Sequence, residues 1–309
     1  MNELNVFFIS KTRNIKMPNS TFEIDNLNKF AIYTLLYISI QTIVLNSLNT
    51  VIILFLIKNK TFSNVLFLFM SINDFLNGAL SVPGEILSRA NEKWPLGKPL
   101  CLFFKTIDYS SSSLSLVLLL VITTHRYIQL KDPFKQKEAM NRRRWLFLGF
   151  VWVFCYLMWF IIWYIYFMDE LNIDKSQPET FNIYFFIVRS LEMILPFLII
   201  LFMNVLLIRS FVLIKRTRRG SKPNFKKQNK AIYCVISITI NVVVCWTMFL
   251  TLWPINKLCD ECVPANVNVF SDLSNYLFSA LNPIILLHYN SNYRNRLKQK
   301  LVQMCCTIT

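Results

Sequence analysis

Seven long apolar runs separated by short polar segments constrain this chain more than any other feature. The runs cover residues 31–57, 64–89, 99–129, 145–168, 183–214, 231–257 and 266–288. Each is long enough to cross about 30 Å of hydrocarbon as a helix. Hydrophobic residues make up 54% of the chain, more than the ~45–50% typical of soluble proteins. The sequence therefore predicts an all-α membrane protein, a seven-transmembrane helix bundle.

The charged segments between the runs indicate the orientation of the chain. Lys and Arg cluster after the first, third, fifth and seventh runs, and acidic residues occur in the segments between. Basic segments favour the cytoplasm, so we expect a multi-pass plasma-membrane protein with its N-terminus outside. The predicted parts are an extracellular segment at 1–30, a seven-transmembrane domain at 31–290, and a cytoplasmic interfacial helix and tail at 291–309. The net charge of +16 reflects topology rather than nucleic-acid binding, because no nucleic-acid motif accompanies it.

Both ends of the chain contain candidate modification sites. Asn19 begins an Asn-Ser-Thr sequence on the predicted extracellular side, where a glycan is expected. Residues 292–304 alternate basic with apolar side chains, as in a short interfacial helix. Cys305 and Cys306 follow it and are either palmitoylated or unmodified.

Asp108 is an ionisable residue inside the third apolar run. It lies eighteen residues before Arg126, so the two charges share one helix about 27 Å apart. A charge in hydrocarbon costs a few kcal/mol or more, and the default interpretation is a functional group that faces the bundle interior. The alternative is a structural pair with Lys105, three residues earlier on the same face.

Motifs in successive runs follow the order and approximate spacing of a known family. They are Ser63-Asn64, Asp74, Trp94, Cys101, Arg126-Tyr127, Trp152, Pro196, Cys245-Trp246 and Asn282-Pro283. Over residues 31–304 the chain resembles the rhodopsin-like G-protein-coupled receptors. Either Asn46 or Asn49 matches the family asparagine of the first helix. The resemblance implies a ligand-activated receptor that signals through a heterotrimeric G protein, with the inhibitory class expected.

The chain resembles the amine receptors within that family, because Asp108 and Tyr109 stand where those receptors hold a protonated amine. A carboxylate there offers charge-assisted hydrogen bonds at low dielectric. The stretch SLEMILPFLIILFMN is similar to histamine receptors of the third and fourth subtypes, whose matching glutamate, here Glu192, binds the imidazole. Histamine is therefore the favoured ligand. The resemblance implies an amine site made of Asp108, Tyr109, Glu192, Trp246, Phe249 and Tyr276.

Other functions stay open or are disfavoured. Lys105 and Arg189 each precede a proposed ligand-binding acid by three residues. If those pairs form, a divergent receptor for another amine, or for a zwitterionic or neutral ligand, fits as well. A transporter is less favoured, since no repeats or paired broken helices are visible. A retinal protein lacks its lysine, because Tyr276 holds that position, and an enzyme lacks an assembled catalytic set.

The resemblance also implies two internal sites. Asp74, Ser115, Ser279 and Asn282 match most of the family's sodium site, for which the alternative is a hydrated buried carboxyl. No other cofactor is expected. At the cytoplasmic end, His125, Arg126 and Tyr127 form the implied G-protein coupling segment. His125 replaces the usual acid beside Arg126, so we hypothesise raised basal activity.

Cysteines give one further prediction. Cys259 and Cys262 form a C-x-x-C pattern in the loop before the seventh run, and a small loop disulfide is favoured over zinc because no second pair accompanies them. Residues 161–186 contain no cysteine, which leaves Cys101 without its usual partner from that loop.

Overall fold

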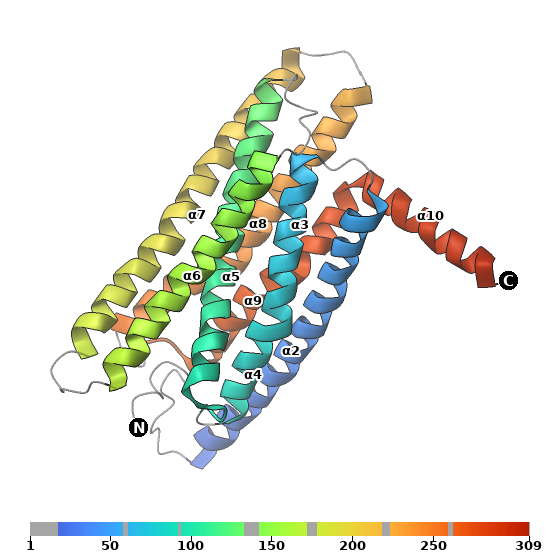
Figure 1. Ribbon diagram of the computed structural model, residues 1–309. Helices are drawn as coiled ribbons and strands as arrows, with labels where there is room; N and C mark the ends of the chain where they lie inside the picture. The colour runs from blue at the N-terminus through green and yellow to red at the C-terminus, as the bar shows by residue number, and fades with distance from the viewer. Residues whose placement is uncertain are drawn as a thin grey trace.

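The computed structural model describes residues 18–57, 61–91, 94–132, 142–171, 178–217, 223–258 and 262–308. Within them, seven long helical segments run alternately up and down in one bundle, which confirms the predicted fold (Figure 1). Their bounds are α2 (Pro18–Val51) with η1 (Ile52–Leu56), α3 (Phe62–Leu76) with η2 (Asn77–Ser81) and α4 (Val82–Ala90), α5 (Gly97–Lys131), α6 (Arg142–Leu171), α7 (Pro178–Thr217), α8 (Pro223–Leu258) and α9 (Ala265–Tyr289).

Hydropathy distinguishes six of these segments among the described residues. The six that are long and apolar enough to cross a membrane are Asp25–Leu56, Phe62–Ala90, Gly97–Lys131, Arg142–Ile165, Ile187–Lys215 and Asn229–Leu252. The predicted seventh, α9, packs between α8 and α2. It carries several polar side chains, including Asp272 and Asn282, which lower its mean hydropathy. Asp272 and Asn282 both bind other helices, at Arg89 and Asp74 respectively.

The first helix begins earlier than the apolar run predicts. Helix α2 starts at Pro18, well before the expected boundary at residue 31. Its early turns are water-compatible, since Asp25 and Lys29 form an exposed ion pair of 2.7 Å. The boundary between the N-terminal segment and the bundle therefore falls inside one continuous helix.

The core lies where α3, α5, α7, α8 and α9 meet. Its buried side chains include Leu66, Leu114, Leu207, Val235 and Trp246. Large apolar side chains on α6 and α7 instead point outward, as at Phe150 and Phe202. Exposed apolar side chains on these helices suit a lipid environment, where they need no further burial.

A π-helical turn, η2, sets the direction of the next helix. The Val82 N–H donates to the Asn77 carbonyl, five residues back, and Pro83 follows without an N–H to donate. Gly78 permits close contact here, because an added Cβ would lie 2.8 Å from the Thr42 Cγ2 atom. The turn directs Ser81 toward α5, where it contacts the candidate site.

The last helix, α10 (Ser291–Ile308), leaves the bundle at a steep angle (Figure 1). Buried Tyr293 anchors it by donating to the Asn64 Oδ1 atom at 3.4 Å. Arg294 donates to the Leu287 carbonyl at 3.0 Å. The predicted C-terminal helix is thus present. Cys305 and Cys306 lie in its final turns, but their side chains fall outside the described set, so their acylation stays a prediction.

Candidate functional site

Asp108 lies in the first half of α5 and receives two hydroxyl hydrogen bonds. Ser81 from η2 donates to Oδ1 at 2.5 Å, and Tyr276 from α9 donates to the same oxygen at 3.2 Å. Within the described residues, no basic group lies within ion-pair distance of this carboxylate. Its negative charge is therefore stabilised by dipoles and not by a paired cation.

A network of ion pairs lies next to Asp108, because Glu85 and Lys105 line the same small cavity as this carboxylate. Arg89 joins two helices, since Nε lies 2.9 Å from Glu85 in α4 and Nη2 lies 2.6 Å from Asp272 in α9. The Lys105 ammonium is 4.0 Å from Glu85. The alternative in which Lys105 pairs with Asp108 is not observed, because this lysine approaches Glu85 instead.

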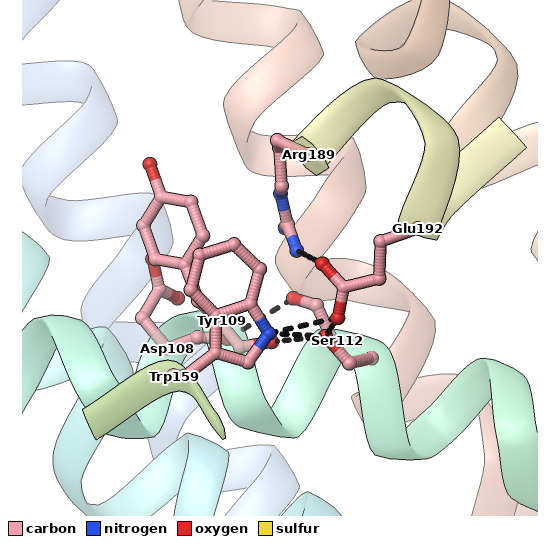
Figure 2. Close-up of polar contacts among 7 residues, drawn as sticks. Asp108, Tyr109, Ser112, Trp159, Arg189 and Glu192 are labelled. Carbon is pink, nitrogen blue, oxygen red and sulfur yellow. Dashed lines mark hydrogen bonds and ion pairs between the residues drawn. The ribbon is translucent and has the colours of Figure 1, made fainter. Parts of the chain in front are cut away.

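Glu192, the second predicted ligand-binding acid, is already engaged. Its Oε2 atom lies 3.2 Å from the Arg189 Nη1 atom. Its Oε1 atom accepts hydrogen bonds from Trp159 Nε1 at 2.8 Å and from the Ser113 hydroxyl. Figure 2 shows the Arg189 guanidinium and the Trp159 indole directed at the Glu192 carboxylate. The i,i+3 pair that the sequence offered as an alternative is therefore present here.

The four predicted aromatic residues fall into separate environments. Tyr276 donates to Asp108, whereas Tyr109 packs 4.8 Å from the Trp159 ring centroid and 5.3 Å from that of Trp163. Trp246 and Phe249 belong to the hydrophobic core, and Trp246 is only 2% exposed. Of these four aromatic side chains, Tyr276 is the one that hydrogen-bonds Asp108 within the described residues.

A small cavity of about 10 Å³ adjoins Asp108. The residues that line it include Ser81, Glu85, Trp94, Lys105, Asp108 and Tyr276. Such a volume holds about one water molecule. A larger molecule enters this site only if the surrounding side chains move apart.

The predicted sodium residues lie in one buried polar layer. Asn282 donates to Asp74 Oδ2 at 3.0 Å, Asn73 donates to Ser115 at 3.0 Å, and Asn77 donates to Ser279 at 3.1 Å. Asp74 is fully buried, and its Oδ1 atom has no hydrogen-bond partner within the described residues. A buried carboxylate oxygen in this condition fits a bound cation or water.

The two candidate asparagines in the first helix differ in their contacts. Asn46 donates to the Ser279 carbonyl in α9 at 3.1 Å and to Thr42 in its own helix at 3.0 Å. Asn49 is buried as well. The contact with α9 places Asn46 beside the Asp74 layer.

The end of α5 opposite Asp108 contains the three predicted coupling residues. The His125 Nδ1 atom lies 3.2 Å from the Ser63 hydroxyl, and its ring packs against Phe62. Arg126 Nη1 donates to Gln129 Oε1 at 3.0 Å and makes no ion pair with any described residue. Tyr127 lies under the Lys131 ammonium at 4.7 Å.

The cysteine and glycan predictions are tested only partly. Cys262 is disulfide-bonded, and its expected partner Cys259 lies outside the described residues. Cys101 is buried beside Trp159 and Trp163. Asn19 lies in the first turn of α2, with its side chain outside the described set. The Cys259–Cys262 pairing and the glycan therefore stay predictions.

Several residues of the site were not singled out from the sequence. Glu85 and Arg89 offered a signal, because ionisable residues four apart within an apolar run suggest a buried pair. Ser81 offered none, since its direction depends on the π-helical turn. Trp159 is one of many aromatic residues, and Ser113 is one of four consecutive serines.

Comparison with known proteins identifies the family. The model of the 7 transmembrane receptor (rhodopsin family) matches residues 45–286. The histamine H1 receptor of Rattus norvegicus is 28% identical over 186 residues, covering 55% of this chain and 37% of that receptor. The octopamine receptor beta-2R of Chilo suppressalis is 23% identical over 314 residues, covering 88% of this chain and 80% of that receptor.

The comparisons also limit what the similarity supports. The chain spans 37% and 41% of the length of the Rattus norvegicus and Mus musculus H1 receptors. These histamine relatives are H1 receptors, so the expected similarity to the third and fourth subtypes is not supported. The expectation that the chain is not an enzyme agrees with the receptor family. The chain is a multi-pass membrane protein that belongs to the rhodopsin family of G-protein-coupled receptors and is distantly related to its amine-type members.

Proposed function

We propose that this chain is a plasma-membrane receptor for a small biogenic amine, with its N-terminus extracellular, and that histamine is the favoured ligand. The protonated nitrogen of the ligand binds Asp108, and Arg126 at the other end faces a heterotrimeric G protein, with the inhibitory class expected. Its similarity to histamine and octopamine receptors supports the amine class.

The unpaired charge of Asp108 is the observation that carries this proposal. Glu85, Asp272 and Glu192 each lie within ion-pair distance of a basic group. Asp108 receives only hydroxyl hydrogen bonds from described residues. An ammonium that approaches it gains charge-assisted hydrogen bonds at low dielectric, which are roughly twice as strong as neutral ones. Asp108 is therefore the carboxylate near the site that still lacks a cationic partner among the described residues, and a ligand with one positive charge would supply it.

The ion pair between Glu192 and Arg189 influences which chemical group suits the other end of the ligand. Since Arg189 neutralises this carboxylate, a ligand with one charge and a neutral polar end suits the bundle better than a dication. Histamine as a monocation, with a neutral imidazole, has this form. Tyr109, Trp246 and Phe249 complete the proposed contacts once the side chains separate.

The polar layer below the ligand site supports an internal ion in the same proposal. Asp74 would hold a sodium ion through its unpartnered Oδ1 atom, with Ser115, Ser279 and Asn282 nearby. When bound, the ion would neutralise the buried carboxylate and favour the resting arrangement of the helices.

Radioligand competition with histamine, octopamine and uncharged analogues tests the amine proposal. Asp108→Asn keeps an oxygen acceptor for Ser81 and Tyr276 and removes only the charge. Removing one partner of a buried charged pair costs about 2–5 kcal/mol, so amine affinity should fall by about 30-fold or more. Asp272→Asn is the matched control, because that carboxylate already pairs with Arg89.

Two results would count against the proposal. Equal amine affinity of the wild type and Asp108→Asn would show that this carboxylate is not the anchor. Binding of uncharged or zwitterionic compounds, with no amine bound by the wild type, would favour the divergent-receptor alternative.

A further inference from the structure

The guanidinium of Arg189 is enclosed in a setting that resembles a ligand-binding site for a cation. The residue is only 4% exposed. Its Cζ atom lies 4.4 Å from the Tyr109 ring centroid and 5.2 Å from the Trp159 ring centroid. Its Nη1 atom lies 3.2 Å from the Glu192 carboxylate. Figure 2 shows the guanidinium between these side chains.

These surroundings match the chemistry that recognises planar cations. Ring faces attract cations through their quadrupole, and a guanidinium also stacks on aromatic rings and binds carboxylates. The contributing residues come from three helices, with Tyr109 on α5, Trp159 on α6 and Glu192 on α7. Within this cluster, the Arg189 guanidinium lies where a bound cation would lie.

The site is held together by contacts that do not involve Arg189. Trp159 donates to Glu192 Oε1 at 2.8 Å and to the Ser113 hydroxyl at 2.8 Å. Tyr109 packs directly on the Trp159 ring at 4.8 Å. The carboxylate and the two rings therefore have orienting contacts other than those with the guanidinium.

Arg89 provides a contrast within the same molecule. It also lies in the outer half of the bundle, and it pairs with the two carboxylates Glu85 and Asp272. It bridges α4 and α9 as a structural link. Arg189 differs because it combines one carboxylate with two aromatic faces.

We propose that Tyr109, Trp159 and Glu192 form a guanidinium-binding site that the chain fills with its own Arg189. Arg189 is thereby a specificity-determining residue, because it closes this half of the bundle to a second cationic group. The existence of the site does not depend on amine binding at Asp108. The consequence for ligand choice rests on the proposed function.

The consequence is a preference for monocations over dications. In the wild type, a molecule with a cation at each end meets Asp108 at one end and the Arg189 guanidinium at the other. Shortening Arg189 exposes Glu192 and two ring faces to the second cation. The structure thus predicts that one substitution extends the ligand class to compounds with an amine and a guanidinium.

Chemical rescue of Arg189→Ala tests the site directly. The full-length receptor is purified in lipid nanodiscs, and thermal unfolding is followed with methylguanidine or with methylurea, a neutral compound of the same shape. The variant should unfold at a lower temperature than the wild type. Methylguanidine should raise this unfolding temperature toward the wild-type value, with an effect that saturates as its concentration increases. Methylurea should restore nothing. Arg209→Ala, an exposed arginine on the same helix, should neither lose stability nor respond.

Two double variants separate this site from the amine site. Arg189→Ala with Glu192→Gln should lose the rescue, because the carboxylate charge is gone. Arg189→Ala with Asp108→Asn should keep it. Rescue by methylurea as strong as by methylguanidine, rescue that survives Glu192→Gln, or an Arg189→Ala variant as stable as the wild type would each overturn the proposal.

A second measurement applies if Arg189→Ala does not fold. Arg189→Gln keeps most of the side-chain length, and it should raise competition by agmatine, which has one ammonium and one guanidinium end. The expected gain over the wild type is about tenfold or more, the size of one charge-assisted hydrogen bond. No gain for agmatine would overturn the proposed selection by Arg189.

Discussion

His125 offers the sharpest test of how the Arg126 end of the bundle would hold the resting state of the proposed receptor. The Arg126 guanidinium donates to Gln129 and makes no ion pair among the described residues. Its Nε atom is buried and has no hydrogen-bond partner in the part of the chain that the structure describes. A carboxylate at position 125, introduced by His125→Asp, would supply the missing negative partner.

The size of the effect follows from the contact that would form. A hydrogen bond to a charged group contributes about 1.5–3 kcal/mol, which corresponds to roughly a 10- to 150-fold change in an equilibrium between two states. If the new bond forms only at rest, the substitution lowers the active population by up to that factor. We therefore expect a clear fall in basal signal.

Basal nucleotide exchange on a co-reconstituted G protein measures this population without a ligand. His125→Asn is the matched control, since it keeps a neutral polar group near the Ser63 hydroxyl and adds no charge. The wild type and His125→Asn should show similar high basal exchange, and His125→Asp should show less. Equal exchange in all three proteins, at equal expression, would refute the reasoning.

Two further predictions concern packing and the buried polar layer. Gly78→Ala should lower the free energy of unfolding by about 1–3 kcal/mol in a thermal denaturation assay, because the new Cβ would lie 2.8 Å from Thr42 Cγ2. Gly149→Ala is the control and should have little effect, because its Cβ would meet nothing within 4 Å. Asn282→Ala should lower the free energy of unfolding by about 1–3 kcal/mol in the same assay, because Asp74 loses its 3.0 Å hydrogen bond while it stays buried. An unchanged unfolding temperature would show that water or an ion replaces the amide.

The bundle was predictable from the sequence because its determinants are local. The length of the apolar runs predicted the helices. It also predicted α9, because the mixed sequence of this helix still contains a long apolar run. The C-terminal helix also followed from a local alternation of basic and apolar residues. The start of α2 was less predictable, since its first turns are polar and exposed.

The site was only partly predictable because its contacts cross between helices. Lys105 and Arg189 have the same i−3 spacing to an acid, yet Arg189 pairs with Glu192 while Lys105 approaches Glu85 on another helix. Sequence spacing identifies which pairs are possible within one helix. It cannot rank them against partners such as Glu85, whose position depends on how α4 and α5 pack.

The π-helical turn η2 divides the bundle's second helical segment into two parts, and the side chains after the turn are rotated about the helix axis relative to those before it. One extra residue in a turn rotates every later side chain by about 100° relative to an uninterrupted α-helix. Asn73 and Asp74 precede the turn, Ser81 is its last residue, and Glu85 and Arg89 follow it. Deleting one residue of η2 would therefore redirect the outer three side chains away from Asp108 and Asp272 while leaving the inner polar layer in register.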